Sequence, residues 1–358
     1  MRNILVTGGA GFIGSNFIHW LTEHNLDLSV VNLDALTYAG NLENLKNLEG
    51  SNHYHFIQGD IADQVLVESI LREYEIDTVV NFAAESHVDR SILSPMDFLK
   101  TNVVGTGLLL DSVRKIWKDK NPEGLRFHHI STDEVFGSLG PGDPPFCETS
   151  QYSPNSPYSA SKAASDHLVR AYHHTYGLPI TISNCTNNYG PFQFPEKLIP
   201  LVIMNCIKGN PLPVYGDGRQ VRDWLYVEDH CKAIQMILEN GRAGETYLLG
   251  GENQPTNLEI IQQITSILDE LLPDSPFKPH ANLIKFVPDR PGHDRRYAMD
   301  ISKVRRELNW NPDHDLEKGL RATVEWYLSN QEWVNALANR EEFGSWMNKN
   351  YSNRGVEK

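Results

Sequence analysis

The sequence predicts an α/β fold with a doubly wound parallel sheet, followed by a smaller C-terminal domain. Short apolar runs recur through the first half of the chain, separated by segments long enough for helices, which is the pattern of repeated strand–helix–strand units. The runs at residues 29–33 and 77–81 are largely aliphatic and β-branched, as expected for strands buried on both faces. The length of 358 residues allows about two domains, and 40% hydrophobic residues can fill a large core.

The elements follow in order along the chain. We predict strands at residues 4–7, 28–33, 55–58, 78–82, 127–131 and 180–185, with a helix at 15–23 after the first strand. Five prolines between residues 191 and 213 interrupt this alternation and indicate the start of a second unit. Residues 223–227, a helical pattern at 228–240 and residues 245–250 predict a return to the sheet. Further helices are expected at 257–272 and 301–308, and a last strand at 283–287.

These elements predict a domain division. Residues 1–190 should form the doubly wound domain, with 221–250 returning to it. Residues 191–220 and 251–345 should form the smaller domain, and residues 346–358 a frayed tail.

Composition argues against several classes of partner. The chain has 32 Lys and Arg against 46 Asp and Glu, a net charge of −14, which disfavours nucleic acids and anionic membranes. The apolar run at the start ends at Thr7, too soon for a signal peptide, and no stretch is long enough to span a membrane. The 14 histidines lack the spacing of a helical metal site, so we expect no metal. The cysteines form no CxxC pair, which fits free thiols in a reducing cytoplasm: Cys147, Cys185, Cys206 and Cys231.

A glycine-rich turn follows the first strand. Gly8, Gly11 and Gly14 are spaced by three residues and open a helix, the context in which such a turn binds a dinucleotide pyrophosphate. Asp34 lies 20 residues after Gly14, at the end of the second strand, where its carboxylate can bind ribose hydroxyls and would repel a 2′-phosphate. The first domain is therefore predicted to be of the Rossmann type and to bind NAD rather than NADP. The alternative is a purely structural turn in which Asp34 caps a loop.

Reactive side chains gather near the middle of the chain. Tyr158 and Lys162 are four residues apart, hence on one helix face, and a cation beside the phenol would lower its pKa enough for it to act as a base. Thr132 follows the strand at 127–131, at the sheet edge where ligands bind. Asp133 and Glu134 come next. If their environments differ, one can stay protonated as a general acid while the other serves as a base. The alternative is an exposed acidic turn.

Several of these motifs resemble those of the extended short-chain dehydrogenase/reductase family. Residues 7–14 read TGGAGFIG, residues 60–61 read DI, residues 81–84 read NFAA, and Tyr158 and Lys162 form a YxxxK pair. The resemblance implies an NAD-dependent enzyme in which Tyr158 is the base and Lys162 contacts the nicotinamide ribose. It implies these NAD-binding residues: Gly8, Gly11, Phe12, Ile13, Gly14, Asp34, Asp60, Ile61, Ala83, Ala84, Ser131, Tyr158 and Lys162.

Within that family, residues 131–137 (STDEVFG) are similar to the motif of the nucleotide-sugar 4,6-dehydratases. Residues 84–91, 183–191, 215–218, 222–227 and 289–297 match as well, so the resemblance covers about residues 1–310. Phe136 stands where a tyrosine is usual. The resemblance implies conversion of dTDP-glucose to a 4-keto-6-deoxy sugar: Tyr158 and Thr132 act at the C4 hydroxyl, Glu134 removes the C5 proton, and Asp133 protonates the departing C6 hydroxyl.

The same resemblance implies a set of substrate-binding residues and a homodimer. The substrate residues are Ser86, Thr132, Asn187, Lys197, Arg222, Asn257, Arg290, His293 and Tyr297. The dimer would form through helices near 95–117 and 157–176. UDP- or CDP-glucose remain alternative substrates. A nucleotide-sugar 4-epimerase is a less favoured alternative, because it needs no acid–base pair at 133–134, and an inactive NAD-sensing regulator would have lost the reactive residues.

Overall fold

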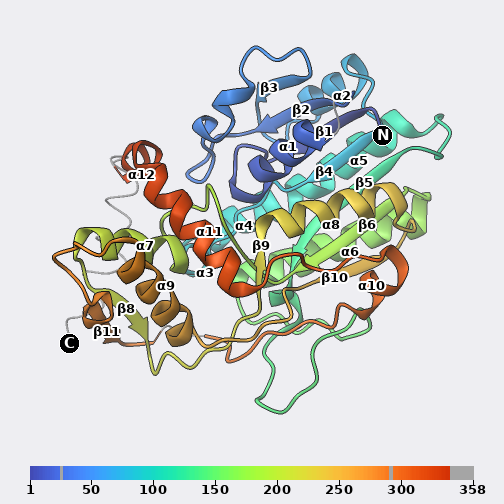
Figure 1. Cartoon of the computed structure of the whole chain (residues 1–358). Helices are drawn as coiled ribbons and strands as arrows, with labels where there is room; N and C mark the ends of the chain where they lie inside the picture. The colour runs from blue at the N-terminus through green and yellow to red at the C-terminus, as the bar shows by residue number, and fades with distance from the viewer. Residues whose placement is uncertain (25–26, 290–292, 339–358) are drawn as a thin grey trace.

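The computed structural model describes residues 1–24, 27–289 and 293–338, and its centre is a seven-stranded parallel sheet (Figure 1). The strand order is β10-β6-β5-β4-β1-β2-β3, which confirms the predicted doubly wound α/β fold. The order reverses between β1 and β4, so a crevice opens at that point beyond the carboxyl ends of the strands. The strands are β1 (Asn3–Thr7), β2 (Ser29–Asp34), β3 (Tyr54–Gln58), β4 (Thr78–Asn81), β5 (Arg126–Thr132), β6 (Ile180–Cys185) and β10 (Thr246–Leu249).

Helices cover both faces of this sheet. Side chains alternate along each strand, so Ile4 and Val6 of β1 pack on one face while Leu5 packs on the other. Figure 1 shows α1 (Phe12–His24) and α8 (Val227–Asn240) side by side on the first face. The second face is covered by α2 (Gln64–Glu73), α5 (Thr106–Trp117) and α6 (Pro157–Tyr176). Shorter helical segments connect these elements: η1 (Leu42–Leu48), α3 (Val88–Leu93), α4 (Pro95–Phe98), η2 (Leu99–Gly105) and η3 (Asp133–Phe136).

The later part of the chain builds a second core beside the sheet. Its helices are α7 (Leu198–Lys208), α9 (Asn257–Leu271) and α11 (Leu316–Ser329), which bury apolar side chains against one another. Its strands pair as β8 (Leu212–Tyr215) with β11 (Ile284–Val287), and η4 (His280–Leu283) leads into β11. Helix α10 (Ser302–Leu308) packs instead near β10. The domain division stays a prediction, and residues 346–358 lie outside the described residues.

The predicted return to the sheet is wrong in one part. Residues 246–249 do join the sheet beside β6, but β9 (Trp224–Tyr226) pairs with β7 (Asn187–Tyr189) in a separate two-stranded sheet. The aromatic rings explain this placement, because Tyr189 makes edge contacts with both Trp224 and Tyr226. Those contacts draw β9 into the second core.

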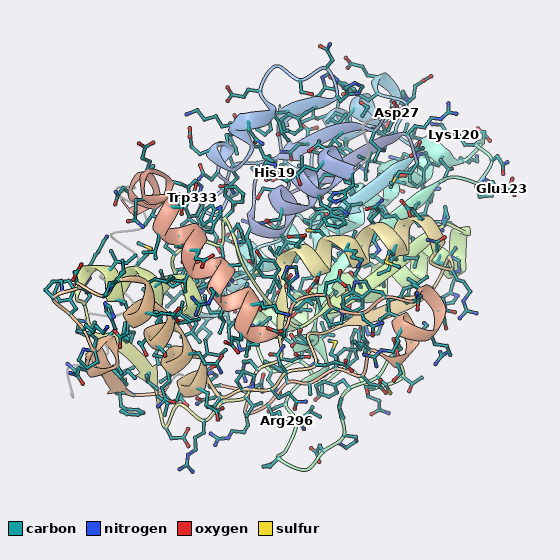
Figure 2. The ribbon with its side chains drawn as sticks, viewed as in Figure 1. His19, Asp27, Lys120, Glu123, Arg296 and Trp333 are labelled. Carbon is teal, nitrogen blue, oxygen red and sulfur yellow. The ribbon has the colours of Figure 1, made fainter. Side chains whose placement is uncertain are left out.

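The last described helix, α12 (Gln331–Ala338), returns to the N-terminal half of the chain. Trp333 Nε1 donates a hydrogen bond to Asn44 Oδ1 (2.8 Å), and its ring meets Phe192, which stacks on His19. Figure 2 labels Trp333 and His19 on this side of the molecule. Leu337 packs with Phe194 in a small core. Helix α12 therefore braces residues that follow β2.

Three further findings bear on the predicted partners. None of the helices in the described residues is long and apolar enough to cross a membrane. Within the same residues, no cluster of three His, Cys, Asp or Glu side chains could hold a metal ion. All four cysteines are free thiols.

Candidate active site

A cavity of about 320 Å³ lies along the carboxyl edge of the seven-stranded sheet. Parallel strands end at the same edge, so the loops that follow them meet there. The cavity brings together most of the predicted site residues: Gly8, Gly11, Phe12, Ile13, Gly14, Asp34, Asp60, Ile61, Ala83, Ala84, Ser86, Ser131, Thr132, Asp133, Glu134, Tyr158, Lys162, Asn187 and Lys197.

The three glycines of the turn have different surroundings. Gly8 has a φ of +69°, and a Cβ there would lie 2.7 Å from Ala83 N. A Cβ on Gly14 would lie 2.4 Å from Gly8 O, whereas one on Gly11 would meet only that oxygen, at 3.3 Å. Gly8 and Gly14 thus allow the tight turn and close packing, and Gly11 is the least crowded of the three. Such a turn before a helix N-terminus fits the pyrophosphate of a dinucleotide.

Asp34 anchors the loop that borders the cavity after β2. Its Oδ2 accepts a hydrogen bond from Ala10 N and its Oδ1 one from Leu36 N, both 2.8 Å. Burial raises the pKa of Asp34, and the two backbone hydrogen bonds oppose that rise. Each carboxylate oxygen retains a second acceptor site, so Asp34 can still bind a ribose hydroxyl.

Sequence reasoning missed part of the cavity wall. The loop at residues 37–40 lines it, as do Thr101 and Glu196. The loop could have been found, because it follows the same strand end as Asp34. Glu196 carries no motif. It accepts a hydrogen bond from Arg90 Nη2 (3.1 Å) and so joins the segment after β7 to α3.

The two adjacent carboxylates lie in different environments. Thr132 ends β5, and its hydroxyl donates to Asp133 Oδ1 (3.1 Å) and accepts from Glu134 N (3.3 Å). Asp133 is only 2% exposed, and its Oδ2 has no hydrogen-bond partner within the described residues. Burial raises the pKa of Asp133 to about 8, and the charge of Glu134 adds to the rise. Asp133 is therefore protonated at neutral pH, while Glu134 is half-buried beside it.

Tyr158 lies in the first turn of α6. The helix begins with Pro157, and Ser156 caps it by accepting a hydrogen bond from Ser159 N (3.1 Å). Burial raises the pKa of the Tyr158 phenol well above its ordinary value, Glu134 raises it further, and a hydrogen bond with Thr132 opposes the rise. The hydroxyls of Tyr158 and Thr132 are therefore neighbours, and both can reach one substrate oxygen.

Lys162 lies deeper, against β5. Its Nζ donates a hydrogen bond to Ile130 O (2.7 Å) and lies 3.3 Å from His129 Nε2. Burial lowers the pKa of Lys162 to about 8, and the charge of Asp166 opposes that change. The residue spacing predicts direct stabilisation of the Tyr158 phenolate, whereas the structure holds the ammonium against a strand carbonyl.

Four predicted substrate residues that the structure describes do not line this cavity: Arg222, Asn257, His293 and Tyr297. Arg222 lies over the ring of Tyr297, with Cζ 4.4 Å from the centroid. Burial raises the pKa of that phenol, and the charges of Glu134 and Asp133 raise it further. This pair is therefore close to the two carboxylates. Asn257 begins α9, and His293 Nδ1 lies 2.6 Å from Asp289 Oδ1. The predicted Arg290 lies outside the described residues.

Known proteins are similar in sequence to this chain over nearly its whole length. A dTDP-glucose 4,6-dehydratase of Xanthomonas campestris pv. campestris (strain B100) is 57% identical over 340 residues, covering 94% of this chain and 96% of that protein. Another, of Escherichia coli (strain K12), is 50% identical over 362 residues, covering 98% and 99%. The chain belongs to the dTDP-glucose 4,6-dehydratase family. A family model described as GDP-mannose 4,6 dehydratase also matches residues 5–323.

Solved structures agree with this membership. The dTDP-glucose 4,6-dehydratase DesIV of Streptomyces venezuelae, solved with NAD and TYD bound, has 45% identity and a TM-score of 0.85, covering 94% of this chain and all of its own. A UDP-glucose 4-epimerase of Thermotoga maritima has 29% identity and a TM-score of 0.79, covering 92% of this chain and all of its own. Epimerases therefore share the fold, and the family is separated from them by its much higher sequence identity.

Proposed function

We propose that this protein is an NAD-dependent dTDP-glucose 4,6-dehydratase, which converts dTDP-glucose to dTDP-4-keto-6-deoxyglucose and water. The observation that carries the proposal is Asp133, held protonated beside Glu134 in the cavity that also contains Tyr158 and the glycine turn. An epimerase has no use for such an acid–base pair. Relatives named for this activity, at up to 57% identity over nearly the whole chain, support the same conclusion.

NAD fits the cavity by its shape and by the chemistry of its walls. The glycine turn and the N-terminus of α1 suit the pyrophosphate, with Phe12 and Ile13 in the first turn. Asp34 would bind the adenosine ribose, and the remaining cofactor contacts would come from Asp60, Ile61, Ala83, Ala84, Ser131, Tyr158 and Lys162. When bound, NAD supplies reversible oxidation and reduction of the sugar, with no net redox change over the cycle.

The residues of the chain supply the proton transfers. Tyr158 Oη would take the proton of the C4 hydroxyl while Thr132 hydrogen-bonds to the same oxygen, which requires that the positive charge of bound NAD offset the burial that raises the pKa of this phenol. The resulting C4 ketone acidifies the C5 proton, which the Glu134 carboxylate removes. Asp133 gives its proton to the C6 hydroxyl, which leaves as water. Burial of Asp133 keeps this proton in place at neutral pH.

The nucleotide diphosphate needs cationic donors because the chain is acidic overall. Lys197 lines the cavity and Arg222 acts on the charge of Asp133, and a guanidinium suits bidentate phosphate contacts. Asn257, His293, Arg290 and Tyr297 would complete the nucleotide end, and Ser86 and Asn187 the sugar end. We propose that residues 191–220 and 251–345 form the domain that binds the nucleotide sugar and residues 1–190 with 221–250 the domain that binds NAD, with Ser86, Asn187 and Arg222 reaching the sugar nucleotide from the second of these.

We also propose that the enzyme is a cytoplasmic homodimer. Exposed apolar side chains gather on the segment from α3 through η2: Ile92, Leu93, Met96, Leu99 and Val104. A second copy of this surface would cover them. The four free thiols fit a reducing compartment.

One assay tests the reaction and the base selectivity together. The purified protein is incubated separately with dTDP-, UDP- and CDP-glucose, without added reductant, and the products are weighed by mass spectrometry. Loss of one water from dTDP-glucose alone is expected. Loss of water only from UDP- or CDP-glucose would reassign the nucleotide, and an unchanged mass with inverted C4 stereochemistry would identify an epimerase.

A further inference from the structure

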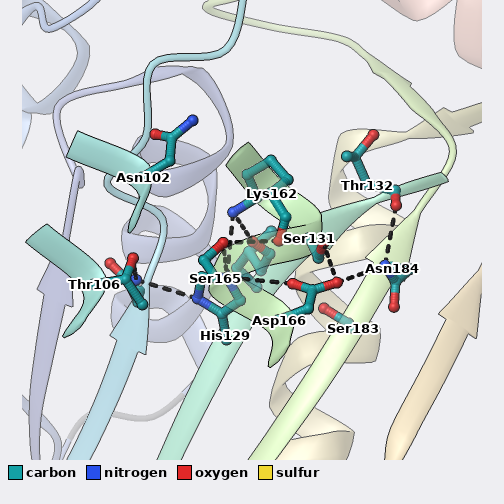
Figure 3. A network of polar contacts seen from close by, with 12 residues as sticks. Asn102, Thr106, His129, Ser131, Thr132, Lys162, Ser165, Asp166, Ser183 and Asn184 are labelled. Atoms are coloured by element: carbon teal, nitrogen blue, oxygen red, sulfur yellow. Dashed lines mark hydrogen bonds and ion pairs between the residues drawn. The ribbon is translucent and has the colours of Figure 1, made fainter. Parts of the chain in front are cut away.

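A buried polar cluster lies behind the cavity, between α6 and the ends of β5 and β6 (Figure 3). We call it the Asp166 cluster; its members are His129, Ser131, Lys162, Asp166 and Asn184. Asp166 lies four residues after Lys162 on α6, and its side chain is 0% exposed. The mechanism above gives this carboxylate no role.

One side-chain oxygen of Asp166 accepts three hydrogen bonds. Oδ2 accepts hydrogen bonds from Ser131 Oγ (2.8 Å), Tyr152 Oη (2.8 Å) and Asn184 Nδ2 (3.3 Å). Burial raises the pKa of Asp166, and the charge of Lys162 and the hydrogen bonds from Tyr152 and Ser131 oppose that rise. Three donors on one oxygen favour the carboxylate form. Asn184 Nδ2 also donates to Thr132 O (3.0 Å). Asp166 thus connects to two successive residues at the end of β5.

The other oxygen faces Lys162 across a histidine. Asp166 Oδ1 lies 3.5 Å from His129 Nε2, and the same nitrogen lies 3.3 Å from Lys162 Nζ. Burial lowers the pKa of His129 well below its ordinary value, and Lys162 lowers it further, so the imidazole is neutral. The cluster therefore contains one anion and one ammonium, separated by an uncharged ring.

The other titratable groups packed around Lys162 do not replace this anion. His128 on β5 is neutral, because burial lowers its pKa to about 3. Burial raises the pKa of the Cys185 thiol on β6 to about 12, so it stays protonated. Arg170, further along α6, is a cation that donates to Tyr152 Oη (2.8 Å). Asp133, beyond Thr132, is itself protonated at neutral pH.

We propose that Asp166 is a positioning residue that keeps the buried Lys162 ammonium charged and fixes the end of β5 that carries Thr132. The inference rests on the proposed function and extends it. An ammonium enclosed by protein loses its proton unless an anion offsets the loss of hydration, and Asp166 is placed to do so. It also hydrogen-bonds Ser131 and Asn184, so it couples the charge of Lys162 to the strand end where the chemistry takes place.

The test is the pH dependence of kcat/KM in Asp166→Asn. Asparagine retains an oxygen that can accept from Ser131 and Tyr152, but it carries no charge. Lys162 should then lose its proton at lower pH, so the alkaline limb of the profile should move toward acid by about one unit. Tyr152→Phe is the matched control: it removes one hydrogen bond to the same oxygen and leaves the charge, so its alkaline limb should stay in place.

Two further measurements separate electrostatics from folding. NAD affinity of Asp166→Asn, measured by calorimetry near pH 6 where Lys162 is protonated, should equal that of the unsubstituted protein. Asp166→Glu keeps the charge and should restore the alkaline limb even if its maximal rate is lower. Should Asp166→Asn not fold, Asp166→Ser provides the same comparison with a smaller side chain.

The outcomes are distinct. A uniform loss of kcat/KM at every pH, with the alkaline limb unmoved, would overturn the proposal and leave Asp166 a structural residue. A shifted limb in Asp166→Glu as large as that in Asp166→Asn would overturn it as well. Failure of the proposed function is recognised separately, because the unsubstituted protein would then release no water from any nucleotide-linked glucose.

Discussion

Replacing Asp133 by Asn removes the proton that the mechanism delivers to the C6 hydroxyl. Burial and the neighbouring Glu134 raise the pKa of Asp133 from 3.8 to about 8. At pH 7 a group with a pKa of 8 is protonated roughly nine-tenths of the time, whereas at its ordinary pKa only about one molecule in 1,600 would be. The environment thus makes the acid form about 10³ times more abundant. Asp133→Asn removes the acid altogether and should lower kcat by about 10²–10⁴, the usual range for a positioned acid.

The assay separates this step from the one before it. In D2O, Asp133→Asn should still exchange the C5 hydrogen of dTDP-glucose for deuterium, because Glu134 is intact, while loss of water is blocked. Glu134→Gln should show neither exchange of the C5 hydrogen nor loss of water. Mass spectrometry of the nucleotide sugar reports both events in one sample. A kcat within tenfold of the unsubstituted protein at pH 7, or loss of C5 exchange in Asp133→Asn, would refute the assignment of Asp133 as the acid.

The same pKa predicts the pH dependence of activity and of stability. The acid form is required for elimination, so kcat should fall as the pH rises through about 8. A raised pKa in the folded state also means that stability is present at low pH and lost as the pH rises through about 8. The amide of Asp133→Asn stays uncharged at every pH, so folding of this variant carries no cost of burying a charge at this position. Its melting temperature should therefore exceed that of the unsubstituted protein at pH 9, although its activity is lower.

Five further substitutions, at four positions, test other parts of the site and the fold. Tyr158→Phe should abolish turnover while NAD binding by calorimetry stays intact; unchanged turnover would remove Tyr158 from the mechanism. Gly14→Ala should lower both the melting temperature and NAD affinity, since its Cβ would lie 2.4 Å from Gly8 O, whereas Gly11→Ala should lose NAD affinity with little change in melting temperature. Equal melting temperatures in the two variants would contradict this reading of the turn. Trp333→Ala should lower the free energy of unfolding by about 3 kcal/mol in urea titrations. Trp333→Phe, which keeps a ring but loses the hydrogen bond to Asn44, should lose clearly less, and an equal loss would show that ring packing is unimportant.

Short patterns in the sequence predicted the strands of the sheet. They also predicted the cavity residues that follow the ends of those strands. A strand, a glycine turn and a helix are contiguous in sequence, so Gly8 to Gly14 could be placed without knowing the rest of the fold. The end of β5 could be placed for the same reason. The pairing of β9 could not be predicted in this way. Its three residues show no periodicity, and the ring that selects its partner strand lies more than 30 residues away in the sequence. The direction of the Lys162 ammonium depends on His129 and Ile130, whose positions only the folded sheet determines.

Helix α12 also sets an order of events during synthesis. Tyr38 lines the cavity in the loop after β2, and it packs against a small core that Leu337 and Phe194 form. The brace from Trp333 reaches Asn44, 289 residues earlier in the chain. At 5–20 residues per second, the ribosome needs roughly 15–60 s to add that length. The strands of the sheet can pair as they emerge, but the loop beside the cavity gains its support only after Trp333 has been added. A nascent chain can therefore enclose a dinucleotide firmly only once α12 has left the ribosome.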